Sequence, residues 1–424
     1  MSQDTFKSTI TLADAARMSG PLAFNIMIKP GGSLCNLDCR YCYYLDKAAI
    51  YGGREPRMSE EMLETLIRNY LESCDAPEVS FNWHGGEPLV MGLDFYKKAV
   101  ELERKYADGK QIHNTLQTNG TLVDPYWAEF FAVNNFLIGI SIDGPQYIHD
   151  EYRSSKAGEP SFSKVMAGLD ILLRGGVEFN TLTAVSRASE GHGLEIYQFL
   201  KSIGSRYMQF LPVVERIKYP VNEKGRPNRS SRPSMVDPHT QGDGFGSWSV
   251  SDLGYGKFLC EIFDWWVKFD VGRFFVNMFD ATLASWCGAM PGTCVACETC
   301  GANAVVEHNG DVYVCDHFVY PEYKLGNVTT SSLRDMVGSD DAVAFGIAKR
   351  NSLPSQCRRC EWLKLCHGEC PKHRLSRTKT GEEGLNSLCA GLRMFYKHSA
   401  PYMEKMRELL EQKRPPAEVI GWRP

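Results

Sequence analysis

The alternation of strand-like and helix-like segments constrains the fold of this chain most. Amphipathic helical patterns, such as 93–107 and the run at 59–73 that Ser59 opens as an N-cap, separate short runs rich in β-branched and aromatic residues. Repeated succession of strand, helix and strand predicts βαβ units and hence a parallel sheet, either doubly wound or barrel-like. The six predicted strands are 22–28, 78–84, 113–119, 136–143, 178–185 and 206–213.

The pattern changes after residue 215. Residues 216–252 are rich in Pro, Gly, Ser and charge, too polar for a core and long for a plain connection, which predicts a surface insertion or linker. A helical pattern resumes at 253–269, and closely spaced cysteines follow with one hairpin signal, the Asn309-Gly310 pair typical of a two-residue turn. The predicted units are an extension at 1–21, an α/β domain at 22–215, the insertion at 216–252, a cysteine-rich domain at 253–398 and a C-terminal helix and tail at 399–424.

Charge and hydropathy argue against several kinds of partner. The 47 Lys and Arg against 51 Asp and Glu give a net charge of -4, without the basic excess that nucleic-acid binding needs. No apolar run approaches the ~18 residues of a membrane span, and the N-terminus lacks a signal pattern. We expect a cytoplasmic monomer without membrane or nucleic-acid partners. Its 15 cysteines are too sparse for a disulfide scaffold and favour metal binding or catalysis.

The first cysteine group follows the first predicted strand. Cys35, Cys39 and Cys42 have the spacing C-x3-C-x2-C. Three thiolates on a four-iron cluster leave one iron open for a substrate or cofactor. A zinc site completed by a remote His, or a coincidence of buried thiols, is the alternative, and the position after the first strand of a parallel domain favours the cluster.

The second cysteine group offers eight thiolates, enough for two four-iron clusters. Zinc knuckles are the structural alternative, because C-x2-C pairs are common zinc ligands. Cys287 and Cys297 lie in the same stretch and compete for the first ligand positions, whereas Cys74 and Cys260 are expected to be buried free thiols. The eight positions are Cys294, Cys300, Cys315, Cys357, Cys360, Cys366, Cys370 and Cys389.

The first group resembles a known signature. CNLDCRYC at 35–42 is similar to that of the radical S-adenosylmethionine superfamily, with Tyr41 at the aromatic position, and HGGEP at 84–88 resembles its GGEP motif. The resemblance implies an α/β fold of partial (β/α)6 TIM-like barrel type, and a 4Fe-4S cluster whose open iron binds S-adenosylmethionine. It places Gly86 at the methionyl amino group, Ser141 at the ribose, Arg153 at the carboxylate and Val214 near the adenine. Ser141 as a plain strand end and Arg153 as a solvated cation remain the alternatives.

The second group resembles the SPASM domain of peptide-modifying radical enzymes, with its C-x2-C-x5-C-x3-C run and a final Cys. In that family the last Cys of the run crosses to the other cluster, so the likeness implies two auxiliary 4Fe-4S clusters and three clusters in all. Auxiliary cluster I would bind Cys294, Cys300, Cys315 and Cys370. Auxiliary cluster II would bind Cys357, Cys360, Cys366 and Cys389.

The motifs together look like those of the anaerobic sulfatase-maturating enzymes from about residue 22 to about residue 398. The likeness implies oxidation of a Cys or Ser in an unfolded sulfatase chain, within a C/S-x-P/A-x-R motif, to Cα-formylglycine. It implies a flavodoxin or ferredoxin as reductant and Asp316 as the acceptor of the thiol or hydroxyl proton. Without the resemblance, Asp316 reads as a turn residue that caps nearby amides.

Two other functions remain open at this point. Another SPASM peptide maturase would form a thioether, an epimer or a crosslink in a ribosomal peptide, and would be expected to carry an N-terminal peptide-recognition domain. Only about twenty residues precede the first predicted strand, which disfavours this reading. A zinc-stabilised binding module without catalysis is the alternative from a different class.

Overall fold

The computed structural model describes residues 23–51, 56–222, 225–237, 240–301 and 303–423. The predicted extension at 1–21 lies outside the described residues. Among those that are described, no helix combines the length and apolar character needed to cross a membrane.

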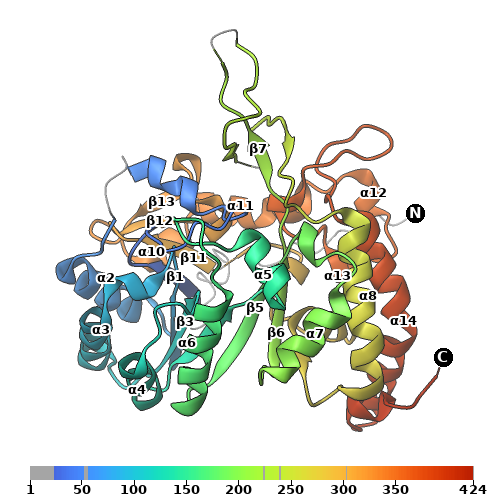
Figure 1. Ribbon diagram of the computed structural model, residues 1–424, viewed down its shortest axis with the longest axis horizontal. Helices are drawn as coiled ribbons and strands as arrows, with labels where there is room; N and C mark the ends of the chain where they lie inside the picture. The colour runs from blue at the N-terminus through green and yellow to red at the C-terminus, as the bar shows by residue number, and fades with distance from the viewer. Residues whose placement is uncertain (1–22, 52–55, 223–224, 238–239, 302, 424) are drawn as a thin grey trace, which may run out of the picture.

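Six parallel strands in chain order form the first half of the molecule, with their helices on the outside (Figure 1). This confirms the predicted α/β partial barrel, and Ser59 caps its first helix as expected, accepting a bond from the Met62 amide. The strands are β1 (Asn25–Lys29), β2 (Glu78–Trp83), β3 (Gln111–Thr118), β4 (Leu137–Ser141), β5 (Phe179–Val185) and β6 (Tyr207–Pro212). The helices are α2 (Glu60–Ser73), α3 (Leu93–Tyr106), α4 (Pro125–Val133), α5 (Gln146–Tyr152), α6 (Phe162–Arg174) and α7 (Gly193–Ser202).

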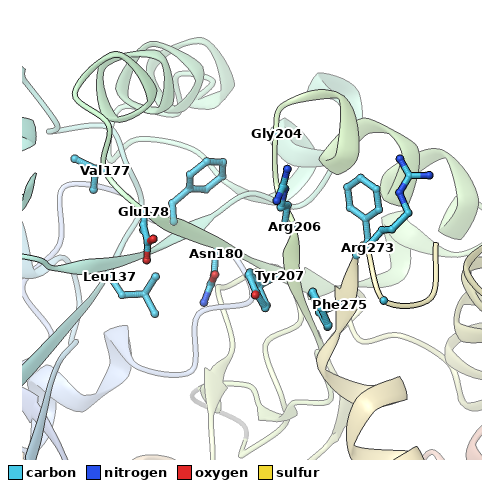
Figure 2. A pocket seen from close by; sticks show the side chains of 12 residues that line it. Leu137, Val177, Glu178, Asn180, Gly204, Arg206, Tyr207, Arg273 and Phe275 are labelled. Carbon is cyan, nitrogen blue, oxygen red and sulfur yellow. The ribbon is translucent and has the colours of Figure 1, made fainter. Parts of the chain in front are cut away.

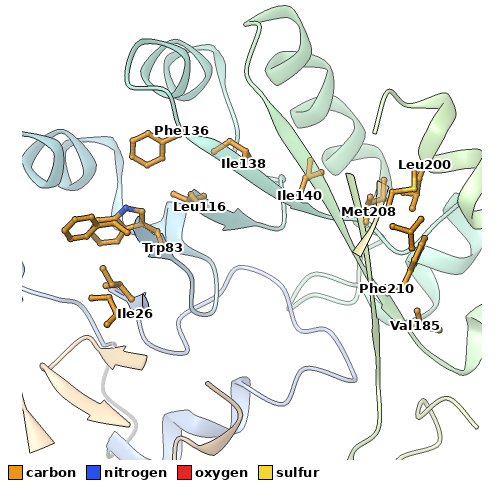
Figure 3. Close-up of a cluster of buried hydrophobic side chains, with 14 of the residues drawn as sticks. Ile26, Trp83, Leu116, Phe136, Ile138, Ile140, Val185, Leu200, Met208 and Phe210 are labelled. Atoms are coloured by element: carbon orange, nitrogen blue, oxygen red, sulfur yellow. The ribbon is translucent and has the colours of Figure 1, made fainter. Parts of the chain in front are cut away.

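The two faces of the barrel strands differ in chemistry. Ile138 and Ile140 of β4 are fully buried among the outer apolar side chains, which Figure 3 shows between the sheet and the helices. The alternate residue Ser141 is half-buried and accepts a 3.0 Å hydrogen bond from Gln117 of β3. Because strand side chains alternate between faces, the apolar side packs on the helices and the polar side remains free to contact ligands.

The cysteine-rich half continues the same sheet. β11 (Asn303–Glu307) runs parallel to β1, and β12 (Asp311–Tyr313) and β13 (Lys324–Asn327) follow antiparallel, while β10 (Phe275–Val276) extends the other edge beside β6. The predicted hairpin is present, but its loop holds three residues instead of two. Gly310 ends that loop with φ 83°, the left-handed conformation that a three-residue hairpin needs.

Helices and short turns complete this half. α14 begins at Cys389 and crosses the predicted boundary at 398/399, because its apolar stripe continues through Met403 and Leu409 and packs beside α8. The remaining helices are α8 (Asp252–Phe269), α9 (Asn277–Trp286), α10 (Leu333–Val337), α11 (Asp340–Asn351), α12 (Ser355–Arg358), α13 (Leu363–Cys366) and α14 (Cys389–Glu411). The 3-10 turns are η1 (Leu45–Tyr51), η2 (Pro88–Met91), η3 (Arg187–Ser189), η4 (Cys294–Ala296), η5 (Asp316–Phe318), η6 (Pro321–Tyr323), η7 (Pro371–His373) and η8 (Pro416–Val419).

The predicted insertion forms a small arm that projects from the body (Figure 1). Its strands β7 (Arg216–Lys218), β8 (Ser234–Met235) and β9 (Gly244–Phe245) pair in the order β8-β7-β9. Strands of two or three residues leave no alternating pattern in the sequence, which is why they were not predicted.

Candidate active site

The loop that follows β1 carries the first three cysteines. Cys39 is buried, and Cys35 and Cys42 are partly exposed beside it in one apolar cluster. Burial raises the pKa of Cys39, and the thiols of Cys42 and Cys35 raise it further, so the three sulfurs lie close together. A buried thiol of this kind ionises when a metal supplies positive charge, which fits an iron-sulfur cluster held at this loop.

The GGEP segment after β2 packs directly on this loop. The Gly86 amide donates to the Gly32 carbonyl at 2.8 Å, and the Glu87 amide donates to the Leu34 carbonyl at 2.8 Å. A Cβ on Gly86 would collide with the carbonyl groups of Leu34 and Ser33. The glycine is therefore required by the contact between two loops, and its predicted contact with the cofactor remains a prediction.

A buried carboxylate links the ends of β2 and β3 to the same loop. Glu87 accepts hydrogen bonds from the Asn119 amide at 2.7 Å, the Thr118 hydroxyl at 2.8 Å and the Leu89 amide at 3.0 Å. Burial raises the pKa of Glu87 to about 7. The Asn119 side chain donates to Asn36, between the first two cysteines, at 2.8 Å.

Arg153 is buried and bound to a partner that sequence reasoning missed. Its guanidinium donates to both carboxylate oxygens of Asp143, at 2.9 and 3.2 Å, and Tyr41 donates its hydroxyl to the same carboxylate. The alternative of a solvated cation is therefore wrong. Asp143 lies two residues after Ser141 in the ISIDG motif, so an acidic residue just past a strand end was the available signal.

The other two predicted cofactor contacts lie at the same end of the barrel. Ser141 ends β4, and Val214 follows β6. Val214 is only 2% exposed and packs in the main core, which leaves little of its side chain for a ligand. Both assignments remain predictions.

Asp316 lies where the two halves of the protein meet. It follows Cys315 in the loop after β12, and its carboxylate forms an ion pair with Lys29, the last residue of β1. Tyr43, which directly follows Cys42, donates its hydroxyl to the other oxygen. The neighbours of two cysteines that are 273 residues apart are thus joined by one hydrogen bond. Among the described residues, no backbone amide bonds to this carboxylate, so the capping alternative is not what the structure contains.

The surroundings of Asp316 keep it ionised. Burial alone would raise its pKa, but Lys29, His317 and His84 together lower the pKa well below its usual range. The side chain of Lys29 is fully buried, whereas that of Asp316 is 14% exposed. The carboxylate can therefore be reached while its counter-ion cannot. Lys29, a cation closing an apolar strand, was the signal that sequence reasoning overlooked.

The remaining cysteines fall into two neighbourhoods. Burial and Glu369 raise the pKa of Cys370 most, and Cys315 and Cys300 raise it further. Burial and Asp316 raise the pKa of Cys315 most, and Cys294 and Cys300 raise it further. Likewise, Cys389 and Cys357 raise the pKa of Cys366 after burial and Glu369. This grouping supports the predicted ligand sets, which remain predictions.

The two competing cysteines behave differently. Cys297 lies near the cysteines predicted for auxiliary cluster I. Burial and Cys294 raise the pKa of Cys300, and Cys297 raises it further. Cys287 is exposed at the end of α9, where Arg407, Glu411 and Glu404 are its charged neighbours. Cys74 is buried and Cys260 is half-buried, both as free thiols.

Two cations, the buried Lys349 and the partly exposed Arg374, hold the cysteine-bearing loops of this half. Lys349 of α11 is 1% exposed and donates to the carbonyls of Cys294, Val295 and Cys297 at 2.7, 3.1 and 2.5 Å. Arg374 donates to the carbonyls of Gly368 and His367 at 3.0 and 2.9 Å. The side chains of Lys349 and Arg374 thus hold together loops that are not positioned by a long strand.

Within the described part of the chain, no three His, Cys, Asp or Glu side chains converge on a point where one metal ion would sit. Each thiolate of a four-iron cluster binds a different iron, so cluster ligands are spaced more widely than those of a single ion. The donor chemistry and grouping of the cysteines therefore fit such clusters.

A separate pocket of about 800 Å³ lies at the opposite end of the barrel (Figure 2). Leu137, Phe179, Tyr207 and Phe275, the first residues of β4, β5, β6 and β10, line it. Barrel enzymes carry their chemistry at the carboxyl ends of the strands, so this pocket is not the active site.

Comparison with protein families agrees with this geometry. Residues 30–200 match the radical SAM superfamily, and residues 297–361 match the SPASM iron-sulfur cluster-binding domain. The fold and the three-thiol loop thus define a radical S-adenosylmethionine protein with a C-terminal iron-sulfur domain.

Full-length relatives narrow the class. A serine-type anaerobic sulfatase-maturating enzyme of Bacteroides thetaiotaomicron is 48% identical over 93% of this chain and 94% of its own length. A cysteine-type enzyme of Clostridium perfringens is 32% identical over 89% and 96%. The solved structure of native anSMEcpe with bound AdoMet and Cp18Cys peptide superposes with a TM-score of 0.77 at 29% identity, over 91% of this chain and 99% of that one. The protein belongs to the anaerobic sulfatase-maturating enzymes, as its motifs predicted.

Proposed function

We propose that this enzyme oxidises a serine in a sulfatase polypeptide to Cα-formylglycine without oxygen. The position of Asp316 between the two cysteine-bearing halves carries the proposal, because it offers a proton acceptor beside both. Serine as the target is supported by the serine-type relatives, which are 48% and 35% identical, whereas a cysteine-type relative is 32% identical.

Three sets of cysteines would hold three 4Fe-4S clusters, the first of them with S-adenosylmethionine. These groups supply a 5′-deoxyadenosyl radical that removes a Cβ hydrogen, and an acceptor for the electron that remains. The sets are Cys35, Cys39 and Cys42; Cys294, Cys300, Cys315 and Cys370; and Cys357, Cys360, Cys366 and Cys389.

The chain's own residues manage the proton. The partly exposed carboxylate of Asp316 would accept the hydroxyl proton of the target serine. Lys29 makes it a weak base, so it acts through position, at the moment when loss of the Cβ hydrogen makes the hydroxyl more acidic. Tyr43 donates a hydrogen bond to one oxygen of the Asp316 carboxylate and so fixes the orientation of that carboxylate.

The polypeptide would enter as an extended segment carrying an S-x-P/A-x-R or C-x-P/A-x-R motif. Asp316 is 14% exposed between the barrel end and the cysteine-rich half, a place that a side chain on a folded domain could hardly reach. Unfolded or newly made sulfatase is therefore the expected substrate. A flavodoxin or ferredoxin would supply the electrons.

Anaerobic incubation with matched peptides tests the proposal. A peptide carrying S-x-P-x-R should lose two hydrogens and react with an aldehyde reagent, with one S-adenosylmethionine cleaved for each aldehyde formed. The same peptide with Ala at the target position is the control. A thioether, an epimer of unchanged mass or no product would contradict the proposal, and the first two would indicate another kind of peptide maturase.

A further inference from the structure

The projecting arm carries an unusual concentration of positive charge. The described residues of the arm, 216–222, 225–237 and 240–245, which we call the basic arm, contain five Arg and Lys against two Asp, in a chain with 47 Arg and Lys against 51 Asp and Glu. The side chains of Lys218, Arg226 and Arg229 are exposed, and among the described residues they take part in no ion pair. Within the described ranges, the fold thus uses none of these three cations in an ion pair.

The base of the basic arm is packed against the first cysteine loop. Ile217 is buried in the same apolar cluster as Leu37 and Cys39, with Tyr219 and Met235 at its edge. The arm is therefore an extension of the surface that covers the first cysteines.

Polar contacts fix the arm in this position. Arg232 forms an ion pair with Asp38, between Cys35 and Cys39, at 2.7 Å. The Met235 amide donates to Asp46 at 2.8 Å. Arg40, between Cys39 and Cys42, is itself exposed, so the cysteine loop reaches the surface beside the arm with a further positive charge.

We infer that the basic arm and the adjoining cysteine loop form the docking surface for a small one-electron carrier protein with an acidic face. This rests on the proposed function, which needs an external reductant at the first cysteines. The carrier gives up one electron and is oxidised, and that electron enters the cleavage of S-adenosylmethionine to methionine and the 5′-deoxyadenosyl radical. Opposite charge accelerates encounter and sets orientation, and the packing brings the bound carrier beside the loop that requires the electron.

Charge reversal separates docking from chemistry. The variant Lys218→Glu/Arg226→Glu/Arg229→Glu is compared with Arg68→Glu/Lys164→Glu/Lys257→Glu, which changes net charge equally at exposed positions on α2, α6 and α8. With an acidic flavodoxin as the probe, calorimetric binding at low salt should weaken at least about tenfold for the arm variant and remain near the parent value for the control. The salt dependence of binding should also become shallower for the arm variant.

Cleavage of S-adenosylmethionine by the holoenzyme provides the second readout. The arm variant should be slower with flavodoxin and unchanged with dithionite, a small reductant that needs no docking. Equal flavodoxin binding by parent and arm variant would overturn the inference, as would a defect confined to the KM of the peptide, which would make the arm a polypeptide-binding surface. Absence of aldehyde from the parent with dithionite would defeat the proposed function while the binding comparison still decides the role of the arm.

Discussion

The two cysteine-bearing regions are held in place by different means. In the barrel, a parallel sheet positions the first loop, and the strand-end segments around Gly86 and Asn119, together with the end of α5 at Tyr152, bond to it directly. In the C-terminal half most of the cysteines lie on loops, turns and short helices, and the buried Lys349 and the partly exposed Arg374 close loops whose cysteines would themselves be cross-linked by clusters. We therefore expect the barrel to keep its loop without iron and the C-terminal half to depend on bound clusters for its stability.

Removing three cysteines from either region should have the largest effect of the changes considered, and the loss of stability should differ most between the two regions. Cys357→Ala/Cys360→Ala/Cys366→Ala should lower the melting temperature by about 10 °C and expose the C-terminal half to protease. Cys35→Ala/Cys39→Ala/Cys42→Ala should abolish S-adenosylmethionine cleavage but shift melting by only about 3 °C or less. Iron analysis should give about a third less iron for either variant, from about twelve irons in the parent. Equal loss of stability would show that both regions depend on metal alike.

Adding a methyl group at Gly86 tests the contact between the GGEP segment and the loop that carries the first three cysteines. Gly86→Ala should displace the loop, cost about 2–3 kcal/mol and lower iron retention at the first site, because the added Cβ meets backbone carbonyls that cannot yield. Gly31→Ala in the same loop is the control, since its Cβ would have only ordinary contacts, the nearest at 3.5 Å. Denaturant unfolding and iron content measure both, and a normal Gly86→Ala protein would contradict the loop contact.

The strands and helices of the barrel could be predicted from the sequence, but the contacts that join the barrel to the C-terminal half could not. Alternating runs and local caps such as Ser59 predicted the six strands and their helices, because those signals lie within each segment. Pairing of β11 with β1, and the bonds from Lys29 and Tyr43 to Asp316, join residues far apart in the chain, and no local pattern encodes them. The same limit hid Lys349, whose carbonyl partners lie more than 50 residues away.

The buried lysine of the C-terminal half should matter less than the metal itself. Lys349→Met keeps the length of the side chain but leaves three loop carbonyls without their donor, which should cost about 2 kcal/mol. In electron paramagnetic resonance, the signal of one auxiliary cluster should be lost while the signals of the other clusters remain. The exposed Lys397→Met on α14 is the matched control, and equal behaviour of the two variants would refute a positioning role for Lys349.

A substitution of the buried Glu103 in the barrel core should have the smallest effect on stability, and that effect should depend on pH. Glu103 of α3 is 2% exposed, and burial raises its pKa to about 8. Because the folded-state pKa lies above that of the unfolded chain, the protonated form stabilises the fold fully below about pH 4.5, and this contribution is lost as pH rises toward 8. Glu103→Gln should flatten the fall in melting temperature across that range, whereas an unchanged pH profile would show that Glu103 does not titrate there.

The role of Asp316 is tested most directly by Asp316→Asn on one anaerobic preparation, with iron, 5′-deoxyadenosine and aldehyde measured together on a serine peptide. The substitution preserves the size of the side chain and removes the proton acceptor. Iron content should remain that of the parent, aldehyde should fall about 10²–10⁴-fold, and 5′-deoxyadenosine should accumulate in excess of aldehyde. A near-normal aldehyde yield at full iron loading would contradict the role assigned to Asp316.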